Sequence, residues 1–243
     1  LQLLARAAEL GLASAQAQLR LLSGLSGDDW AGMAGAIDIA AWLAPPPKRN
    51  LCESPRVRVV DDFVSPAVCD WLVAAAADRL APARTYSETG DARYEQGRTN
   101  TETDFNIAES DMVLVLLRAR IAAAVSLPVA TLELTKVLHY APGQRFNRHF
   151  DCLSPDLEGH AAEIAARGQR LVTFLLYLND DYEGGETEFL HPGLRHRGAK
   201  GCGMYFANVD LAGAPDRNSL HQGLAPTRGE KWLLSQWIRN QPQ

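Results

Sequence analysis

The segment His149-Phe150-Asp151 contains two side chains that could bind one metal ion. Residues i and i+2 of an extended strand point to the same face, so this imidazole and this carboxylate can reach the same ion. His221, in Ser219-Leu220-His221, is the candidate third ligand. Two histidines and one carboxylate leave three octahedral positions open, which suits non-haem Fe(II) with a co-substrate and O2. A solvated His/Asp pair on an edge strand is the alternative for His149 and Asp151 taken alone.

Lys231 is the second residue whose type and surroundings could do chemistry. It begins the aromatic and aliphatic run Lys231-Trp232-Leu233-Leu234, and a buried lysine is unfavourable unless an anion meets it. The alternative is an edge-strand lysine whose ammonium group reaches water. A dicarboxylate that chelates the iron at one end would need such a cation at the other end.

The bulk composition favours one principal globular domain. The chain has 243 residues, of which 47% are hydrophobic, and a formal charge of −5 without a lysine/arginine block, so nucleic-acid binding is not expected. Four cysteines without a CxxC pair indicate neither a structural zinc site nor a disulfide framework. The sequence lacks an apolar run of about eighteen residues and a signal-peptide pattern, so we expect no membrane span. The scattered cysteines fit a reducing compartment, so we expect a cytoplasmic protein, and a compact chain with few cysteines favours a bacterial one.

Short strands with glycine and proline between them follow one another in the C-terminal half. Their number and spacing favour a sandwich or barrel over βαβ units. We therefore expect a mainly β fold with flanking helices (α+β), built on a double-stranded β-helix of the jelly-roll, cupin-like class. The strands are expected at residues 132–140, 145–151, 170–178, 187–189, 202–206, 219–223 and 231–238.

The N-terminal half is expected to be mainly helical. Residues 3–25 have apolar residues at helical spacing with Gly11 between two short helices. They resemble one tetratricopeptide-like repeat unit, which cannot bury its own face alone; an ordinary amphipathic hairpin is the alternative. Pro45-Pro46-Pro47 marks a boundary, so we expect a helical segment with a proline-rich linker at 1–47 and the metal-binding domain at 48–243.

Between the linker and the strands, three further elements are expected. Residues 57–60 form a short strand, and Ser65-Pro66 begins a helix that ends near Arg79. Residues 85–103 are polar with two glycines, which is typical of a mobile loop. Residues 111–124 return to helical spacing.

From residue 57 to 238, about three quarters of its length, the chain resembles the prolyl 4-hydroxylase family of Fe(II)/2-oxoglutarate-dependent dioxygenases. Several stretches carry the resemblance together and are far more specific than any one of them. They are Asp62-Phe63-Val64-Ser65-Pro66, Arg98-Thr99-Asn100, His139-Tyr140-Ala141-Pro142-Gly143-Gln144, His149-Phe150-Asp151, residues 170–179, Gly184-Gly185-Glu186-Thr187, and Ser219-Leu220-His221 with the stretch to Trp237-Ile238.

The resemblance implies a role for each matching residue. His149, Asp151 and His221 match the iron ligands, and Lys231 matches the cation for the distal carboxylate of 2-oxoglutarate. Tyr140, Thr187 and Tyr177 match hydroxyl groups at that carboxylate, although tyrosine and threonine are also ordinary strand formers. Arg170 and Trp237 match positions that hold a peptide substrate, with a surface arginine and a core tryptophan as the alternatives.

Two features concern the substrate. Arg239 stands where a plant-like relative carries histidine, which leaves the identity of the substrate open. The stretch 86–103 corresponds to a lid over the peptide in relatives, and its tyrosines Tyr86 and Tyr94 are candidate contacts.

The resemblance implies a hydroxylase of a peptide or protein proline that consumes 2-oxoglutarate and O2 and releases succinate and CO2. Ascorbate dependence and a homodimer are left open. Three alternatives remain: a hydroxylase of a free amino acid or small metabolite, a non-catalytic jelly-roll binding module, and a zinc hydrolase. The zinc hydrolase is disfavoured because its mechanism would not require Lys231 or Tyr140. Because relatives that halogenate lack the carboxylate ligand, Asp151 favours hydroxylation.

Overall fold

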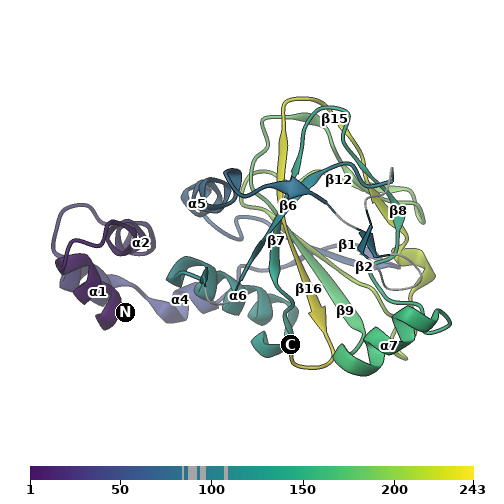
Figure 1. Ribbon diagram of the computed structural model, residues 1–243, viewed down its shortest axis with the longest axis horizontal. Helices are drawn as coiled ribbons and strands as arrows, with labels where there is room; N and C mark the ends of the chain where they lie inside the picture. Colours follow the sequence, from purple (N-terminus) through teal and green to yellow (C-terminus); the bar gives the residue numbers. More distant parts are fainter. Residues whose placement is uncertain (84, 87–91, 94–96, 107–108) are drawn as a thin grey trace. The chain divides into compact units, whose positions relative to one another are not determined.

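The computed structural model describes residues 1–83, 85–86, 92–93, 97–106 and 109–243 (Figure 1). The chain divides into two compact units, one formed by Leu1–Pro45 with Ile107–Ser126 and the other by Pro46–Asn106 with Leu127–Gln243. The domain boundary expected at residue 47 stays a prediction. Residues 107–126 belong to the same compact unit as the N-terminal helices.

The first unit is helical. Its helices are α1 (Gln2–Glu9), α2 (Ala13–Ser23), α3 (Trp30–Ala36), α4 (Ile39–Leu43) and α6 (Met112–Val125). The predicted helical hairpin is confirmed as α1 and α2, and Gly11 between them has a φ of +88°, which an L side chain rarely adopts. Side chains of Asp29, Asp38 and Asp111 accept hydrogen bonds from the first turns of α3, α4 and α6, which satisfies backbone donors there. In the part of the chain that is described, no helix is long and apolar enough to span a bilayer.

The second unit is built on a large antiparallel sheet. Its order is β1-β2-β13-β9-β16-β7-β6-β3, and Figure 1 shows its central strands side by side. The bounds are β1 (Arg49–Glu53), β2 (Arg56–Val60), β3 (Ala81–Pro82), β6 (Thr101–Phe105), β7 (Thr135–Tyr140), β9 (Arg170–Tyr177), β13 (Gly203–Ala207) and β16 (Lys231–Arg239).

A second sheet of four strands, in the order β12-β11-β14-β8, supplies the other layer. Phe189 from this sheet packs in one buried cluster with Leu175, Met204, Phe206 and Leu233 of the large sheet. The predicted mainly β, jelly-roll fold is therefore confirmed. The strands of the second sheet are β8 (Phe146–His149), β11 (Thr187–Phe189), β12 (Leu194–His196) and β14 (His221–Gly223).

Smaller elements complete the second unit. Helix α5 (Pro66–Ala77) confirms the helix predicted from Ser65-Pro66, and α7 (Glu158–Arg167) was not predicted. Short pairs are formed by β10 (Glu183–Gly184) with β15 (Pro226–Arg228), and by β4 (Thr85–Tyr86) with β5 (Ala92–Arg93). Two short 3-10 turns lie at Val129–Thr131 and Arg217–Ser219.

The prediction of a mobile loop over residues 85–103 was wrong at its C-terminal end. Residues 101–105 form β6, which pairs with β7 in the large sheet, and Asn100 before it is only 1% exposed. The strand carries few apolar residues, so its sequence pattern did not indicate it. Its pairing instead places Asp104 opposite Lys136, and Lys136 also contacts Glu102, so opposite charges across the strands stabilise this edge.

Candidate iron and co-substrate site

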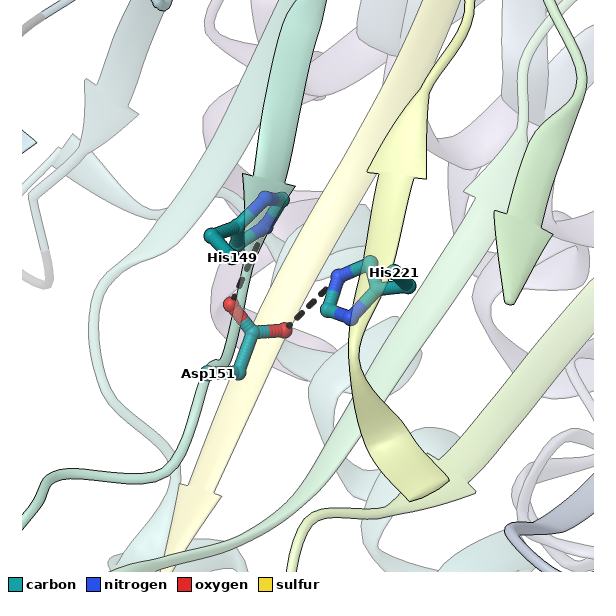
Figure 2. Close-up of side chains that lie close together, drawn as sticks. All are labelled: His149, Asp151 and His221. Atoms are coloured by element: carbon teal, nitrogen blue, oxygen red, sulfur yellow. Dashed lines mark ion pairs between the residues drawn. The ribbon is translucent and has the colours of Figure 1, made fainter. Parts of the chain in front are cut away.

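His149, Asp151 and His221 form a cluster whose candidate ligand atoms all lie within 4.8 Å of one another. Figure 2 shows the Asp151 carboxylate between the two imidazoles. His149 Nε2 lies 3.6 Å from Asp151 Oδ1, and His221 Nε2 lies 3.6 Å from Asp151 Oδ2. Three donors that are far apart in the sequence thus converge around a space that one ion could fill.

Strand pairing explains the convergence. His221 on β14 is directly opposite His149 on β8, so the two imidazoles come from neighbouring strands of the four-stranded sheet. The expected strand over residues 145–151 ends earlier, since β8 stops at His149 and Asp151 lies in a bend beyond it. The predicted proximity of His149 and Asp151 is therefore present, but the regular i, i+2 alternation of one strand does not produce it.

Hydrogen bonds on the far side of each imidazole fix its orientation. His149 Nδ1 lies 2.7 Å from the Asn147 carbonyl oxygen, and His221 Nδ1 lies 2.8 Å from the Ser219 carbonyl oxygen. A carbonyl only accepts, so each Nδ1 carries the proton and each neutral ring keeps the Nε2 lone pair for a metal. Both lone pairs belong to the atoms that face Asp151.

The local electrostatics keep the donors in the states that a metal requires. Burial and the neighbouring His221 lower the pKa of His149, so the imidazole is neutral at pH 7. Burial alone would raise the pKa of Asp151, but the two histidines and the Thr173 hydroxyl outweigh it and lower that pKa. Two imidazoles that present Nε2 and one carboxylate fit Fe(II), and when bound the iron would supply the redox chemistry of O2 activation.

A stack of side chains supports His149 from behind. The ring of Phe146 lies 3.6 Å from the His149 ring and nearly parallel to it, and the Arg98 guanidinium lies 4.5 Å from the centre of the Phe146 ring. Sequence reasoning gave neither residue a role, although Arg98 belongs to a stretch that carries the family resemblance. Phe146 occupies a strand position that any apolar residue could fill, so nothing in the sequence marked it.

Lys231 lies in the same cavity as the metal-binding cluster and is 1% exposed. Its Nζ donates to the Gly185 carbonyl oxygen at 2.7 Å, and it lies 5.3 Å from the centre of the Tyr140 ring. Burial lowers the pKa of Lys231 to about 8, and Glu186 only partly opposes that effect. Among the residues the structure describes, no carboxylate forms an ion pair with Lys231, so its ammonium group is a buried cation that an anionic ligand could neutralise.

The three hydroxyl-bearing residues expected near the co-substrate occupy different places. Tyr140, directly opposite Lys231 on β7, and Thr187 on β11 both line the cavity. Tyr177 does not: its hydroxyl lies 3.3 Å from Thr187 Oγ1 and 3.4 Å from the His196 carbonyl oxygen. Thr187 therefore lies between the Tyr177 hydroxyl and the cavity. A direct contact of Tyr177 with the co-substrate stays a prediction.

The two expected substrate-binding residues form a stacked pair. Trp237 lines the cavity, and the Arg170 guanidinium lies 3.7 Å from the centre of its ring. Arg170 does not line the cavity, because its Nε and Nη2 donate to Glu133 at 2.6 and 3.0 Å. Glu133 also accepts from Arg239, which reaches Glu163 of α7 as well. Arg239 therefore takes part in a buried ion-pair network, and Glu133, which sequence reasoning missed, is the centre of that network.

The candidate lid contacts cannot be placed. Tyr94 lies outside the described residues, and so does the side chain of Tyr86. Of the histidines outside the cluster, His139 pairs with Glu230, and His160 accepts from the Ser154 backbone. Within the described part of the chain, these contacts give His139 and His160 ordinary structural roles.

Comparisons with known proteins agree with this site. Residues 135–239 match the model of the 2OG-Fe(II) oxygenase superfamily, a range that includes His149, Asp151, His221 and Lys231. Prolyl 4-hydroxylase 1 of Arabidopsis thaliana is 31% identical over 201 residues, which cover 76% of this chain and 69% of that protein.

Solved structures extend the comparison to the fold. The viral collagen prolyl hydroxylase of Paramecium bursaria Chlorella virus-1, in complex with 2OG, is 25% identical with a TM-score of 0.59, covering 78% of this chain and 98% of that one. A Trichoplax adhaerens prolyl hydroxylase, in complex with a hypoxia inducible factor peptide fragment, is 12% identical with a TM-score of 0.54 and shares the fold, covering 77% and 85%. The chain therefore belongs to the prolyl 4-hydroxylase family of 2OG-Fe(II) oxygenases.

Proposed function

We propose that this protein is an Fe(II)- and 2-oxoglutarate-dependent hydroxylase that acts on proline in a peptide or protein. One observation carries the proposal: a single cavity is lined both by the His149, Asp151 and His221 cluster and by the buried cation Lys231. A keto acid with a second carboxylate fits this pair, because one end can chelate a metal while the other meets the ammonium group. A jelly-roll binding module without a reaction would have no need for such an arrangement.

Each residue has a separate task in this proposal. His149, Asp151 and His221 would hold the iron on one face and leave the other face to the co-substrate and O2. Lys231 would bind the distal carboxylate, with the hydroxyls of Tyr140 and Thr187 in the same cavity as further donors. Apolar walls such as Leu175 and Leu233 would exclude water from the reacting groups.

A peptide substrate is the form of proline that the relatives favour. The Arabidopsis relatives are named prolyl 4-hydroxylases, and related structures include a collagen prolyl hydroxylase and a complex with a peptide fragment. Trp237 at the cavity offers an apolar, planar surface to a proline ring, and Arg170 stacked on it would hold that surface in place. The cytoplasmic location stays a prediction, and the questions of a homodimer and of ascorbate dependence stay open.

The test is to incubate the protein with Fe(II), 2-oxoglutarate and O2, offering proline-rich peptides in one series and free amino acids in another. We expect succinate to form in proportion to a mass gain of one oxygen on the peptide. His149→Ala is the negative control. Hydroxylation of a free amino acid alone would support the small-metabolite alternative, and binding of a peptide with no consumption of 2-oxoglutarate would support the non-catalytic module.

A further inference from the structure

A chain of two hydrogen bonds leads from the interior of the large sheet to the acidic metal ligand. Thr173 Oγ1 donates to Asp151 Oδ2 at 2.7 Å, and Asn208 Nδ2 donates to Thr173 Oγ1 at 3.0 Å. Thr173 is 1% exposed and Asn208 is fully buried. Thr173 lines the cavity and helps to lower the pKa of Asp151, whereas Asn208 has had no role in the site so far.

The direction of the two bonds follows from the chemistry of the groups. A carboxylate only accepts, so the single hydroxyl proton of Thr173 must point to Asp151. The hydroxyl oxygen can then only accept from Asn208, which fixes the amide with its nitrogen toward Thr173. This orientation leaves Asn208 Oδ1 without a hydrogen-bond partner among the described residues. An unpaired buried carbonyl is unfavourable. Asn208 therefore keeps its hydrogen bond to Thr173 although its own Oδ1 is left without a partner among the described residues.

The fold holds both residues rigidly. Thr173 lies in the middle of β9, between Phe206 of β13 and Trp237 of β16. Asn208 follows β13, and its backbone nitrogen donates to the Leu171 carbonyl oxygen at 2.8 Å. Asp151, by contrast, lies in a bend outside regular structure. The hydrogen-bond chain therefore connects the least regular of the three ligands to the centre of the large sheet.

We propose that Thr173 and Asn208 are positioning residues that hold the Asp151 carboxylate, through its Oδ2, in the orientation in which it faces the two imidazoles. The inference rests on the proposed function, because it concerns the same metal site. Without these hydrogen bonds the carboxylate could rotate in its bend, and the three ligand atoms would no longer be held around one ion.

The test measures metal binding and co-substrate chelation separately from turnover. Mn(II) affinity is titrated without peptide, and the charge-transfer absorption of Fe(II) with 2-oxoglutarate is recorded without O2. We expect Thr173→Val to weaken Mn(II) binding by about 10–100-fold and to reduce the absorption band, as is usual when a partner of a metal ligand is removed. Asn208→Leu should change both readouts in the same direction by a smaller factor, and Thr173→Ser should restore them.

Thr135→Val is the matched control. Thr135 is fully buried in the same sheet and donates to Gln236 Oε1 at 2.6 Å, but it does not line the cavity. We expect this variant to lower the melting temperature while its Mn(II) affinity equals that of the wild type. Equal Mn(II) affinity and an unchanged absorption band in Thr173→Val would overturn the inference. Weaker binding in Thr173→Val, with a wild type that hydroxylates no peptide, would support the inference and contradict only the proposed substrate.

Discussion

The two ends of the cavity differ in how completely their polar groups are satisfied. At the metal end, each ligand has a hydrogen bond that orients it: His149 to Asn147, His221 to Ser219, and Asp151 from Thr173. At the other end, the ammonium group of Lys231 donates to the Gly185 carbonyl oxygen, and no carboxylate of the described residues pairs with it. The metal end is thus preorganised, while the lysine end carries a buried charge that a ligand would neutralise.

This difference indicates that the free energy of metal binding and the free energy of co-substrate binding have different sources. The metal end can bind an ion with little rearrangement, since its donors already face one space. Burying an unpaired ammonium group is costly, and the lowered pKa of Lys231 reflects that cost. Part of the free energy of co-substrate binding would therefore come from relieving an unfavourable state of the free protein.

Removal of a metal ligand should have the largest effect. We expect His149→Ala and Asp151→Ala to reduce hydroxylation by more than the roughly 10–100-fold that loss of a ligand's partner causes, because a ligand itself is lost. Peptide turnover and bound iron after anaerobic loading are the measurements. His191→Ala, at an exposed position, is the control and should behave as wild type. Full activity of either variant would contradict the assignment of His149 and Asp151 as metal ligands.

Replacement of the buried lysine should act in opposite directions on binding and stability. We expect Lys231→Met to weaken 2-oxoglutarate binding by about 2–5 kcal/mol, roughly 30-fold or more, because the carboxylate loses its cation. The same change should stabilise the ligand-free protein by on the order of 1–4 kcal/mol, because a buried charge is removed. Calorimetric titration and thermal unfolding measure the two effects.

Lys200→Met supplies the control for that pair of measurements. Lys200 forms a surface ion pair with Asp70, and such pairs contribute about 0–1 kcal/mol. A Lys231→Met protein that is less stable than the wild type would show that the ammonium group is already compensated, and the contrast between the two ends would disappear.

The pKa of Lys231 also predicts a pH dependence. Below about pH 8 the ammonium group is charged and can bind a carboxylate; above it, the charge is lost and the KM for 2-oxoglutarate should rise by up to about tenfold per pH unit. The folded-state pKa lies below the unfolded value of 10.5, so the ligand-free protein should gain stability as pH rises from about 8 to 10.5. KM and unfolding measured across this range test both signs, and Lys231→Met should lack both responses.

The smallest effects concern the hydroxyls near the lysine. Loss of one hydrogen bond to a carboxylate costs about 1.5–3 kcal/mol, so Thr187→Val should raise the KM for 2-oxoglutarate by roughly 10–150-fold. If Tyr177 acts through Thr187, as its 3.3 Å contact indicates, Tyr177→Phe should add little in the Thr187→Val background. Additive effects in the double variant would instead support the direct contact of Tyr177 that the sequence predicted.

Much of the site could be predicted from the sequence because the strands in which it lies have clear patterns. The apolar run after Lys231 indicated a buried strand, and the structure places Lys231, Leu233, Ser235 and Trp237 of β16 along one cavity. Side chains two residues apart share a strand face, so this part of the cavity wall could be read directly from the sequence. The jelly-roll class followed from the spacing of such segments.

Other parts depended on contacts that no local pattern records. The strand β6 carries mainly polar residues, and its Glu102 and Asp104 pair with Lys136 of β7. Arg170 resembled a substrate-binding residue, yet its partner Glu133 lies in a different segment and could not be identified from spacing. Asn208 has no feature in the sequence that distinguishes it from a surface asparagine.

The sequence by itself determined which groups could do chemistry: two imidazoles, one carboxylate and one lysine, in or next to segments with the pattern of buried strands. Tertiary structure decided their states, because pairing of β8 with β14 brings His149 opposite His221, and burial without a counterion gives Lys231 its low pKa. The physical reason is that residue type and periodicity are local properties of the chain, whereas desolvation and the direction of each hydrogen bond depend on which distant segments pack together.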